Sequence, residues 1–320
     1  MTTRWAMVGT GLMLDLIGWD FALVDEVDLR VIVSRTQERA DASAARFGIP
    51  EGSADLDAVL ARDDIDLVYV ATPHTEHLRI AMTAIDAGKH VLVEKPMTTS
   101  AADTRLLCEH ARRNGRFAME AMWMAFNPVI QEVDRRVADG AIGDVGVLHA
   151  NFGMPFPFDS GSRMWKASLG GGSTLDQGVY AVSLAQLLFG NPISVSSRGT
   201  VDHDVDTEVA TTLEFATGAR ASLLTSMRVL TPLDAYLGGT TGHLRINGPF
   251  WSTNGFSVSG PATDDVTIPP EGMGYVPMLR AVNQAVEAGL LEHELRTHAD
   301  TVAVAETLDE ILRQVHGVEQ

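Results

Sequence analysis

The stretch Trp5-Ala-Met-Val-Gly-Thr-Gly-Leu-Met13 decides the fold, because a short apolar run stands directly before Gly9 and Gly11. Glycines at these places let the backbone turn tightly and approach a pyrophosphate, which the free N–H groups of a following helix can bind. The third glycine of this dinucleotide fingerprint falls at Leu14, which departs from the pattern. Alone, the two glycines are equally compatible with an ordinary strand-to-helix turn.

Strand-like and helix-like segments alternate over the first 120 residues. Apolar, β-branched runs occupy 29–33, 66–71 and 90–93, and a short further strand is expected at 117–119. Helical stretches at 36–47, 55–62, 75–87 and 100–114 lie between them, and glycines that favour helix C-termini follow three of these. Such alternation predicts a parallel sheet with right-handed crossovers. The sequence therefore predicts an α/β chain whose residues 1–120 form a doubly wound Rossmann domain.

The pattern changes after residue 120. Successive β segments broken by Gly, Asp and Asn fill 193–268, and the runs 209–215 and 219–225 flank Ala216-Thr-Gly218, a hairpin signal. Helices are expected at 127–139, 175–189, 276–290 and 298–315. We predict a second domain over 121–320, α+β in class, with a large, open and mostly antiparallel sheet.

Charge and composition argue against several classes of function. The 320 residues carry 24 Lys and Arg against 42 Asp and Glu, and this net charge of −18 repels nucleic acid and anionic membranes. No apolar run approaches the roughly 20 residues of a membrane helix, and we expect no signal peptide. Cys108 is the single cysteine, so no intramolecular disulfide can form and a cytoplasmic location is predicted.

The end of the second predicted strand indicates which nucleotide binds. An acidic residue there holds a ribose 2′-hydroxyl, whereas an arginine accommodates a 2′-phosphate. Ser34 and Arg35 follow the strand, Arg39 comes one helical turn later, and no carboxylate occupies the strand end. Arginine can bind a phosphate through a charge-assisted fork. The sequence favours NADP over NAD, although a solvated arginine at a helix start would give the same pattern.

A lysine motif carries a resemblance to a known family. Glu94-Lys95-Pro96 directly follows a strand, at the sheet edge where ligands of this fold bind. The run from Ala71-Thr-Pro-His-Thr-Glu-His77 through Ala87-Gly-Lys-His-Val-Leu-Val-Glu-Lys-Pro96 resembles the Gfo/Idh/MocA oxidoreductases. The resemblance implies a nucleotide-binding domain, an α/β substrate domain, a functional Lys95, and a homo-oligomer, dimer or tetramer, built through the C-terminal sheet.

A glycine-rich turn agrees with this family. Gly170-Gly-Gly-Ser-Thr-Leu-Asp-Gln-Gly-Val-Tyr180 places Asp176 and Tyr180 four residues apart, on one helical face. A tyrosine rather than a histidine at 180 resembles the branch of dimeric dihydrodiol dehydrogenase, glucose–fructose oxidoreductase and NADP xylose dehydrogenase. The stretches 120–128 and 163–165 support that branch. Ala125 departs from it, because arginine is common there.

These residues together suggest a reaction. Hydride transfer to a carbonyl builds negative charge on oxygen, so a proton donor must lie within hydrogen-bond reach. A free tyrosine has a pKa of about 10, and a neighbouring lysine lowers it towards neutrality. We predict an NAD(P)-dependent dehydrogenase or reductase acting on the CH–OH group of a sugar, cyclic polyol or diol. In it Tyr180 is the acid/base, Lys95 its electrostatic partner, and Asp176 orients substrate or Lys95.

The predicted site falls into three sets. The catalytic residues are Lys95, Tyr180 and Asp176. The cofactor-binding residues are Gly9, Thr10, Gly11, Leu12, Met13, Ser34, Arg35, Arg39, Thr72, Pro73, His74, His77, Glu94 and Lys95. The substrate-binding residues are Lys95, Trp123, Arg163, Trp165, Asp176 and Tyr180. No metal is predicted, because His74 and His77 have no third ligand cluster near them in the sequence.

Other interpretations stay open for several of these residues. Trp123 and Trp165 are as compatible with core packing as with the wall of a sugar site, and Asp176 with a first-turn carboxylate facing the helix dipole. The rival function is a dinucleotide-sensing regulator of the same fold, which binds the cofactor without turnover. Fold alone does not decide between them. A sensor can dispense with the lysine and the acid, yet both Lys95 and Tyr180 are present.

Overall fold

The computed structural model describes residues 2–261 and 263–317. The chain divides into two compact units, and neither is continuous in sequence. The first unit comprises Met1–Trp123 and Pro270–Thr301, and the second Met124–Pro269 and Val302–Gln320. The domain boundary at residue 120 stays a prediction, but it did not anticipate that the segment from Pro270 groups with the N-terminal part.

The first unit is built on a six-stranded sheet in the order β3-β2-β1-β4-β5-β6. Every neighbouring pair of strands is parallel, which confirms the predicted doubly wound sheet. The central strand β4 is buried along its whole length, as strands covered on both faces are. The strands are β1 (Thr3–Val8), β2 (Val27–Val33), β3 (Glu51–Ser53), β4 (Leu67–Val70), β5 (His90–Val93) and β6 (Ala118–Glu120).

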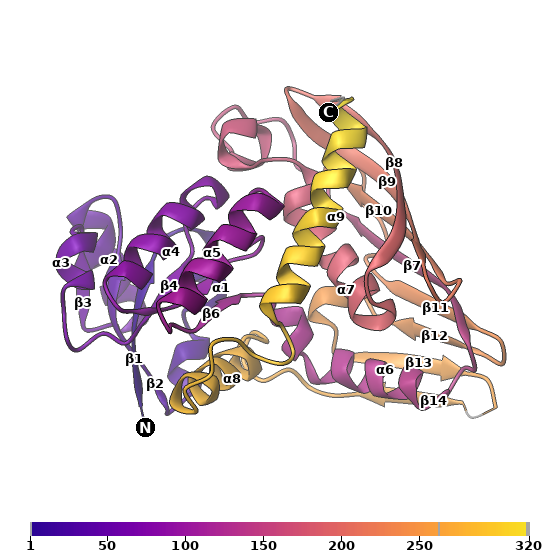
Figure 1. Cartoon of the computed structure of the whole chain (residues 1–320), viewed down its shortest axis with the longest axis horizontal. Coiled ribbons are helices and arrows are strands. Elements are labelled where there is room, and N and C mark those ends of the chain that lie inside the picture. Colours follow the sequence, from indigo (N-terminus) through magenta and orange to yellow (C-terminus); the bar gives the residue numbers. More distant parts are fainter. Residues whose placement is uncertain (1, 262, 318–320) are drawn as a thin grey trace. The chain divides into compact units, whose positions relative to one another are not determined.

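Helices alternate with these strands near the predicted positions. Side-chain caps fix their starts: Thr36, Asp55 and Ser100 each accept a hydrogen bond from a first-turn backbone N–H. Figure 1 shows α4 and α5 side by side along the sheet. The helices are α1 (Leu12–Ile17), α2 (Gln37–Phe47), α3 (Leu56–Leu60), α4 (His77–Asp86), α5 (Ala101–Arg113) and α8 (Val276–Glu287).

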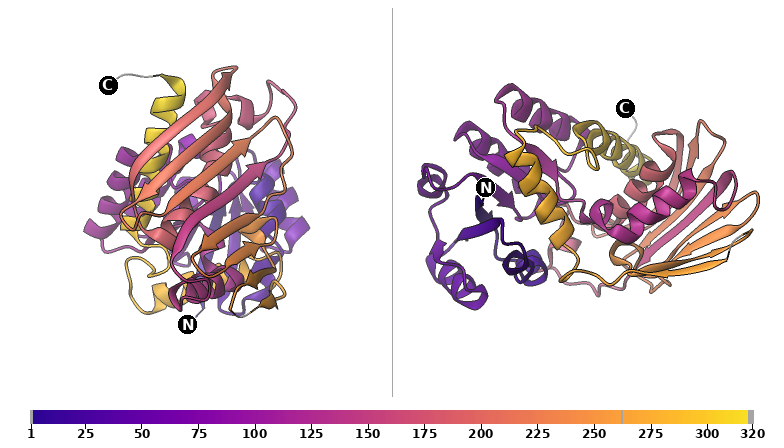
Figure 2. Two further views of the ribbon diagram at one scale, coloured as in Figure 1. Left: turned by 90° about the vertical axis from the view of Figure 1, so that its right-hand side faces the viewer. Right: turned by 90° about the horizontal axis from the view of Figure 1, so that it is seen from below.

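The second unit contains an eight-stranded sheet in the order β14-β13-β12-β11-β7-β10-β9-β8, seen face-on in Figure 2. The pairs are antiparallel except β7 with β10, which confirms the predicted open, mostly antiparallel sheet. The predicted hairpin is β9–β10. The strands are β7 (Val145–Gly153), β8 (Pro192–Asp202), β9 (Val205–Phe215), β10 (Arg220–Ser226), β11 (Ala235–Gly239), β12 (His243–Ile246), β13 (Gly255–Ser259) and β14 (Asp264–Thr267).

Helices cover one face of this sheet. They are α6 (Pro128–Ala138), α7 (Val179–Phe189) and most of α9 (His298–His316). The other face exposes Val147 and Tyr236, while Leu148 and Leu237 beside them are fully buried, so side chains alternate across the pleat. The homo-oligomer through this sheet stays a prediction. In the described part of the chain, no helix combines the length and apolarity needed to cross a membrane.

Candidate functional site

Most predicted cofactor residues follow four neighbouring parallel strands. The strands β2, β1, β4 and β5 are adjacent, and their carboxyl ends point to one edge of the sheet. The segments 34–39, 9–13, 72–77 and 94–95 come directly after them. Hydrogen bonds from Gly9 N–H to the Val33 carbonyl (2.9 Å) and from Ala71 N–H to the Val8 carbonyl (2.8 Å) hold the strand ends in register. This edge is where a doubly wound sheet binds a dinucleotide.

The turn after β1 has space that suits a pyrophosphate. Gly9 has φ +126°, and a Cβ there would lie 2.2 Å from the Ala71 carbonyl oxygen, so only glycine fits. A Cβ on Gly11 would meet nothing within 4 Å, which leaves room for a ligand against the backbone. The helix α1 begins at once with Leu12 and Met13, and Gly11 caps it without a side chain. Leu14, in place of the third glycine, is buried.

The end of β2 presents a hydroxyl and two cations. Thr10 Oγ1 lies 2.8 Å from Ser34 Oγ, which joins the two strand-end loops. Arg35 and Arg39 are exposed. Within residues 2–261 and 263–317 neither guanidinium has a hydrogen-bond or ion-pair partner, although the neighbouring arginines Arg30 and Arg46 both pair with carboxylates. Two unpaired guanidinium groups next to a serine can bind a phosphate group.

The segment after β4 contains both histidines. His77 is fully buried, and its ring nitrogens lie 3.0 Å from the Pro96 carbonyl and 2.9 Å from the Thr72 carbonyl. His77 therefore ties the loop after β4 to the loop after β5. The Thr72 hydroxyl is buried and lacks a hydrogen-bond partner among the described residues. The His74 ring packs edge-on against His77, and the described residues contain no group of three potential metal ligands.

Lys95 lies just after the end of β5, next to the buried carboxylate of Glu94. Glu94 is 3% exposed and Lys95 9%. The Tyr69 hydroxyl donates to one Glu94 oxygen, and the Lys95 backbone N–H donates to the other at 3.1 Å. Burial raises the pKa of Glu94 to about 7, against the opposing effects of the Tyr69 hydrogen bond and the Lys95 charge. Glu94 thus anchors the strand end from inside.

A second buried carboxylate, that of Glu120, binds the backbone just after Lys95 and Pro96. Glu120, at the end of β6, accepts a hydrogen bond from the Met97 N–H at 2.8 Å. Its other oxygen pairs with the guanidinium of Arg296, and both side chains are nearly inaccessible. Sequence reasoning did not assign a role to Tyr69 or Arg296 and used Glu120 only for the resemblance, because these contacts join residues far apart in the chain.

Asp176 and Tyr180 lie at the start of one helix in the second unit. Thr174–Gly178 form a π-helical turn that runs directly into α7. The helix predicted from about 175 is present, but its first turn is π-helical and therefore wider than an α-helical turn. Such turns are frequent at functional sites. Asp176 Oδ1 accepts a hydrogen bond from Arg163 Nη2 at 2.9 Å, and Tyr180 is buried.

An aromatic wall lies beside Tyr180. The rings of Phe152 and Trp251 stack with centroids 3.6 Å apart, and the Tyr180 ring is 6.0 Å from the first and 5.9 Å from the second. Sequence reasoning missed both wall residues, since they lie about 100 positions apart and neither belongs to a recognisable motif. Trp165 instead packs in a core cluster with Met164, Val205 and Met227.

Trp123 belongs to the first unit, where its ring stacks on Tyr275 at 4.3 Å. The predicted site residues are therefore divided between the units. The cofactor-binding set, Lys95 and Trp123 lie in the first, and Arg163, Trp165, Asp176 and Tyr180 in the second. Trp123, predicted for substrate, thus lies with the cofactor-binding residues, and the roles of all these residues stay predictions.

Known proteins resemble the chain over nearly its whole length. Residues 3–122 match the Gfo/Idh/MocA model described as an oxidoreductase family with an NAD-binding Rossmann fold, and residues 130–245 match the C-terminal domain of that family. Trans-1,2-dihydrobenzene-1,2-diol dehydrogenase of Xenopus laevis is 31% identical over 327 residues, covering 98% of each chain. The same enzyme of Danio rerio is 28% identical and covers 98% of this chain and 97% of its own.

Solved structures share the fold. A 3-ketoreductase from Actinomadura kijaniata, in complex with NADP and TDP-benzene, superposes with a TM-score of 0.87 at 27% identity and 98% coverage of both chains. A levoglucosan dehydrogenase superposes with a TM-score of 0.90 at 20% identity, covering 99% of this chain and 98% of its own, and so shows the fold alone. On its sequence, its two units and these matches, the chain belongs to the Gfo/Idh/MocA family of NAD(P)-dependent oxidoreductases.

Proposed function

We propose that this chain transfers hydride between NADP and the CH–OH carbon of a sugar, cyclic polyol or diol, with Tyr180 as acid/base and Lys95 as its electrostatic partner. The observation that carries the proposal is the pair of buried functional groups on the two units: a lysine at the cofactor edge of the first, and a tyrosine beside an aromatic wall in the second. A sensor of dinucleotide needs neither.

NADP fits the residues present. The backbone of 9–13 would hold the pyrophosphate, where an added Cβ on Gly11 meets only open space. Ser34, Arg35 and Arg39 would bind the 2′-phosphate, and the orphaned hydroxyl of Thr72 would gain a partner in the cofactor. The related 3-ketoreductase has NADP in its structure, which supports the same choice here. NAD is the alternative that the arginines disfavour.

The nicotinamide ring supplies or accepts the hydride when the cofactor is bound. Tyr180 gives its proton to the carbonyl oxygen in reduction and takes it back in oxidation. The Lys95 ammonium stabilises the phenolate and the negative charge that develops on the substrate oxygen. Asp176, held by Arg163 at 2.9 Å, would orient a substrate hydroxyl.

A ring-shaped substrate suits the aromatic wall. Stacked Phe152 and Trp251 offer flat apolar surface next to Tyr180, and flat apolar faces occur on sugar rings and on cyclic diols. The names of the relatives point the same way, since one acts on a dihydrobenzenediol and another holds TDP-benzene. We further propose a cytoplasmic homo-oligomer, paired through the exposed face of the C-terminal sheet.

The test is turnover on a panel of ring substrates. Trans-1,2-dihydrobenzene-1,2-diol, levoglucosan and xylose would be offered with NADP⁺, and NADPH formation followed by absorbance. We expect oxidation of at least one, with Phe152→Ala and Trp251→Ala raising KM for it. Tight NADPH binding with no turnover across the panel and with the corresponding ketones would favour the regulatory sensor instead.

A further inference from the structure

A buried carboxylate from β9 reaches the start of the helix that bears Tyr180. Asp206 is 1% exposed. Its Oδ2 accepts hydrogen bonds from Ser173 Oγ (2.9 Å), from the Thr174 backbone N–H (2.6 Å) and from Thr174 Oγ1 (2.7 Å). A carboxylate is rarely buried unless its oxygens are satisfied in this way. The hydrogen bonds of Asp206 Oδ2 therefore connect β9 to the first residues of this helix.

The hydrogen bonds reach the functional turn without an intermediary. Thr174 is the first residue of the π-helical turn, which contains Asp176 and continues into α7 and Tyr180. A second strand contributes, because Thr225 Oγ1 donates to Ser173 Oγ at 3.1 Å. The helix start is therefore fixed to β9 by Asp206 and to β10 by Thr225.

The glycine-rich turn is shaped around this carboxylate. Gly172 has φ +109°, and a Cβ there would lie 2.1 Å from Asp206 Oδ1. No side chain can be accommodated at that distance, so the carboxylate itself requires glycine at 172. The turn before the helix and the acid on β9 therefore form one unit, although 34 positions separate the two residues in the numbering.

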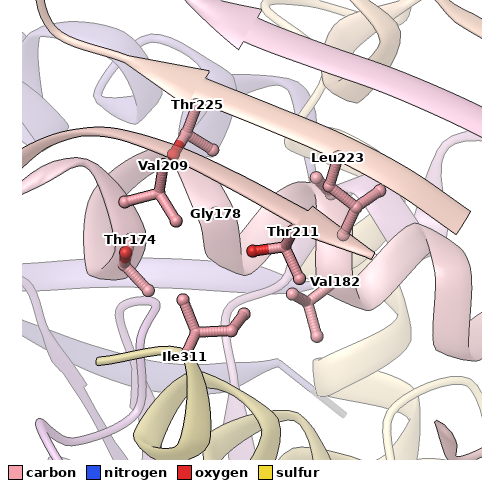
Figure 3. Close-up of a pocket in the computed structure, with 9 residues that line it drawn as sticks. Thr174, Gly178, Val182, Val209, Thr211, Leu223, Thr225 and Ile311 are labelled. Carbon is pink, nitrogen blue, oxygen red and sulfur yellow. The ribbon is translucent and has the colours of Figure 1, made fainter. Parts of the chain in front are cut away.

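A small cavity lies beside the helix start. The cavity has a volume of about 10 Å³ and is lined by Thr174, Gly178, Ala181, Val182, Val209, Thr211, Leu223, Thr225 and Ile311. A volume of this size is about that of one water molecule. Figure 3 shows the labelled lining residues, which come from the π-helical turn, α7, β9, β10 and α9. The cavity borders Thr174 and Gly178 of the π-helical turn.

We propose that Asp206 is a positioning residue for the reaction, which fixes the π-helical turn so that Asp176 and Tyr180 point in the productive direction. The inference rests on the proposed function of Tyr180. Small displacements of an acid/base group reduce the rate of chemistry more than they reduce substrate binding.

The experiment compares Asp206→Asn with Thr207→Val. Thr207 is the next residue on β9, is fully buried, and donates to the Thr200 carbonyl at 3.2 Å instead of to the helix. Three quantities would be measured: hydrogen exchange of peptides covering 173–183, NADPH affinity by fluorescence, and kcat and KM for the panel substrate that is oxidised fastest with NADP⁺.

Asp206→Asn is expected to speed exchange across 173–183 and to lower kcat by about tenfold or more, with KM and NADPH affinity changed by less than about twofold. Thr207→Val is expected to lower the Tm but to leave the exchange rate over 173–183, the NADPH affinity, kcat and KM near their wild-type values. If Asp206→Asn does not fold, Thr174→Val replaces it, and Thr174→Ser, which keeps the hydroxyl, is expected to restore kcat.

The inference is overturned if exchange over 173–183 is unchanged, or if kcat falls no further than in Thr207→Val. Tyr180→Phe separates this failure from that of the proposed function. If Tyr180→Phe is inactive and Asp206→Asn has wild-type kcat, only the positioning role of Asp206 is disproved. A fully active Tyr180→Phe removes the proposed acid/base, and with it the role of Asp206.

Discussion

The two units place their proposed functional groups by different means. In the first, the carboxylate next to Lys95 in the chain is Glu94, which binds the Lys95 backbone directly. In the second, the carboxylate that holds the helix of Tyr180 comes from another strand. A carboxylate that neighbours its partner in the chain forms a sequence motif, as Glu94 and Lys95 do. A carboxylate that reaches its partner from another strand, as Asp206 does, has no motif around it. A motif search therefore finds Lys95 and its neighbour Glu94, but it misses the more distant partners Tyr69 and Arg296, and it misses Asp206 on the tyrosine side altogether.

The largest effect is expected from removing the proposed acid/base. Tyr180→Phe keeps the ring that packs near Phe152 and Trp251 but removes the proton, so kcat should fall by about a thousandfold. Its NADPH affinity, measured by fluorescence, should match wild type because the cofactor residues lie in the first unit. Lys95→Met should lower kcat similarly. A Tyr180→Phe protein with wild-type kcat would show that the second unit does not supply the acid/base.

The buried Glu94 should make stability depend on pH. Burial raises its pKa from 4.5 to about 7, so the folded state holds a proton that the unfolded state releases. The stabilisation is complete below pH 4.5 and is lost as pH rises through about 7, to a total of about 3 kcal/mol at most.

Urea unfolding of wild type and Glu94→Gln across this range would measure the effect. The Gln variant should lose most of this slope. Equal slopes in wild type and Glu94→Gln would show that folding does not raise the pKa of Glu94.

The preference for NADPH over NADH tests only the residues at the carboxyl ends of the strands in the first unit. Arg35→Ala removes a guanidinium that has no protein partner in the described chain, so NADPH affinity should fall by about ten- to a hundredfold while NADH affinity stays the same. Fluorescence titration with both nucleotides measures this. Arg46→Ala, which breaks an exposed pair with Asp15, is the matched control. An equal loss for NADH and NADPH would contradict a 2′-phosphate contact.

Two glycines should respond in opposite ways to the same substitution. Gly178 has helical angles (φ −61°, ψ −33°), and an added Cβ would make ordinary contacts with the Thr174 and Thr225 methyl groups at 3.7 Å and with the Ser173 carbonyl oxygen at 3.8 Å. Gly178→Ala should therefore stabilise by about 1 kcal/mol. Gly172→Ala should destabilise, because its Cβ would meet Asp206. Thermal melts give both signs, and a neutral Gly172→Ala would mean that the carboxylate can move away.

The fold was predictable because its signals are local. Alternating runs and strand-end glycines predict the parallel sheet, and the hairpin around Ala216-Thr-Gly218 predicts the pairing of β9 with β10. The site was predictable where a motif follows a strand, as with Lys95. Phe152, Trp251, Arg296 and Asp206 were not, since each acts through a partner distant in the chain. The π-helical turn was missed as well, because the spacing of Asp176 and Tyr180 suits a regular α-helix.

The discontinuity of the first unit has a consequence for synthesis. Glu120 emerges from the ribosome long before Arg296, its buried partner, and α8 is also made late. Until the second unit has been translated, the nucleotide-binding part therefore has a carboxylate at the end of β6 that lacks its cationic partner. A chain that stops after Trp123 contains every cofactor residue predicted from the sequence but lacks the segment that closes the unit. Newly made chains should thus acquire dinucleotide binding only at the end of translation.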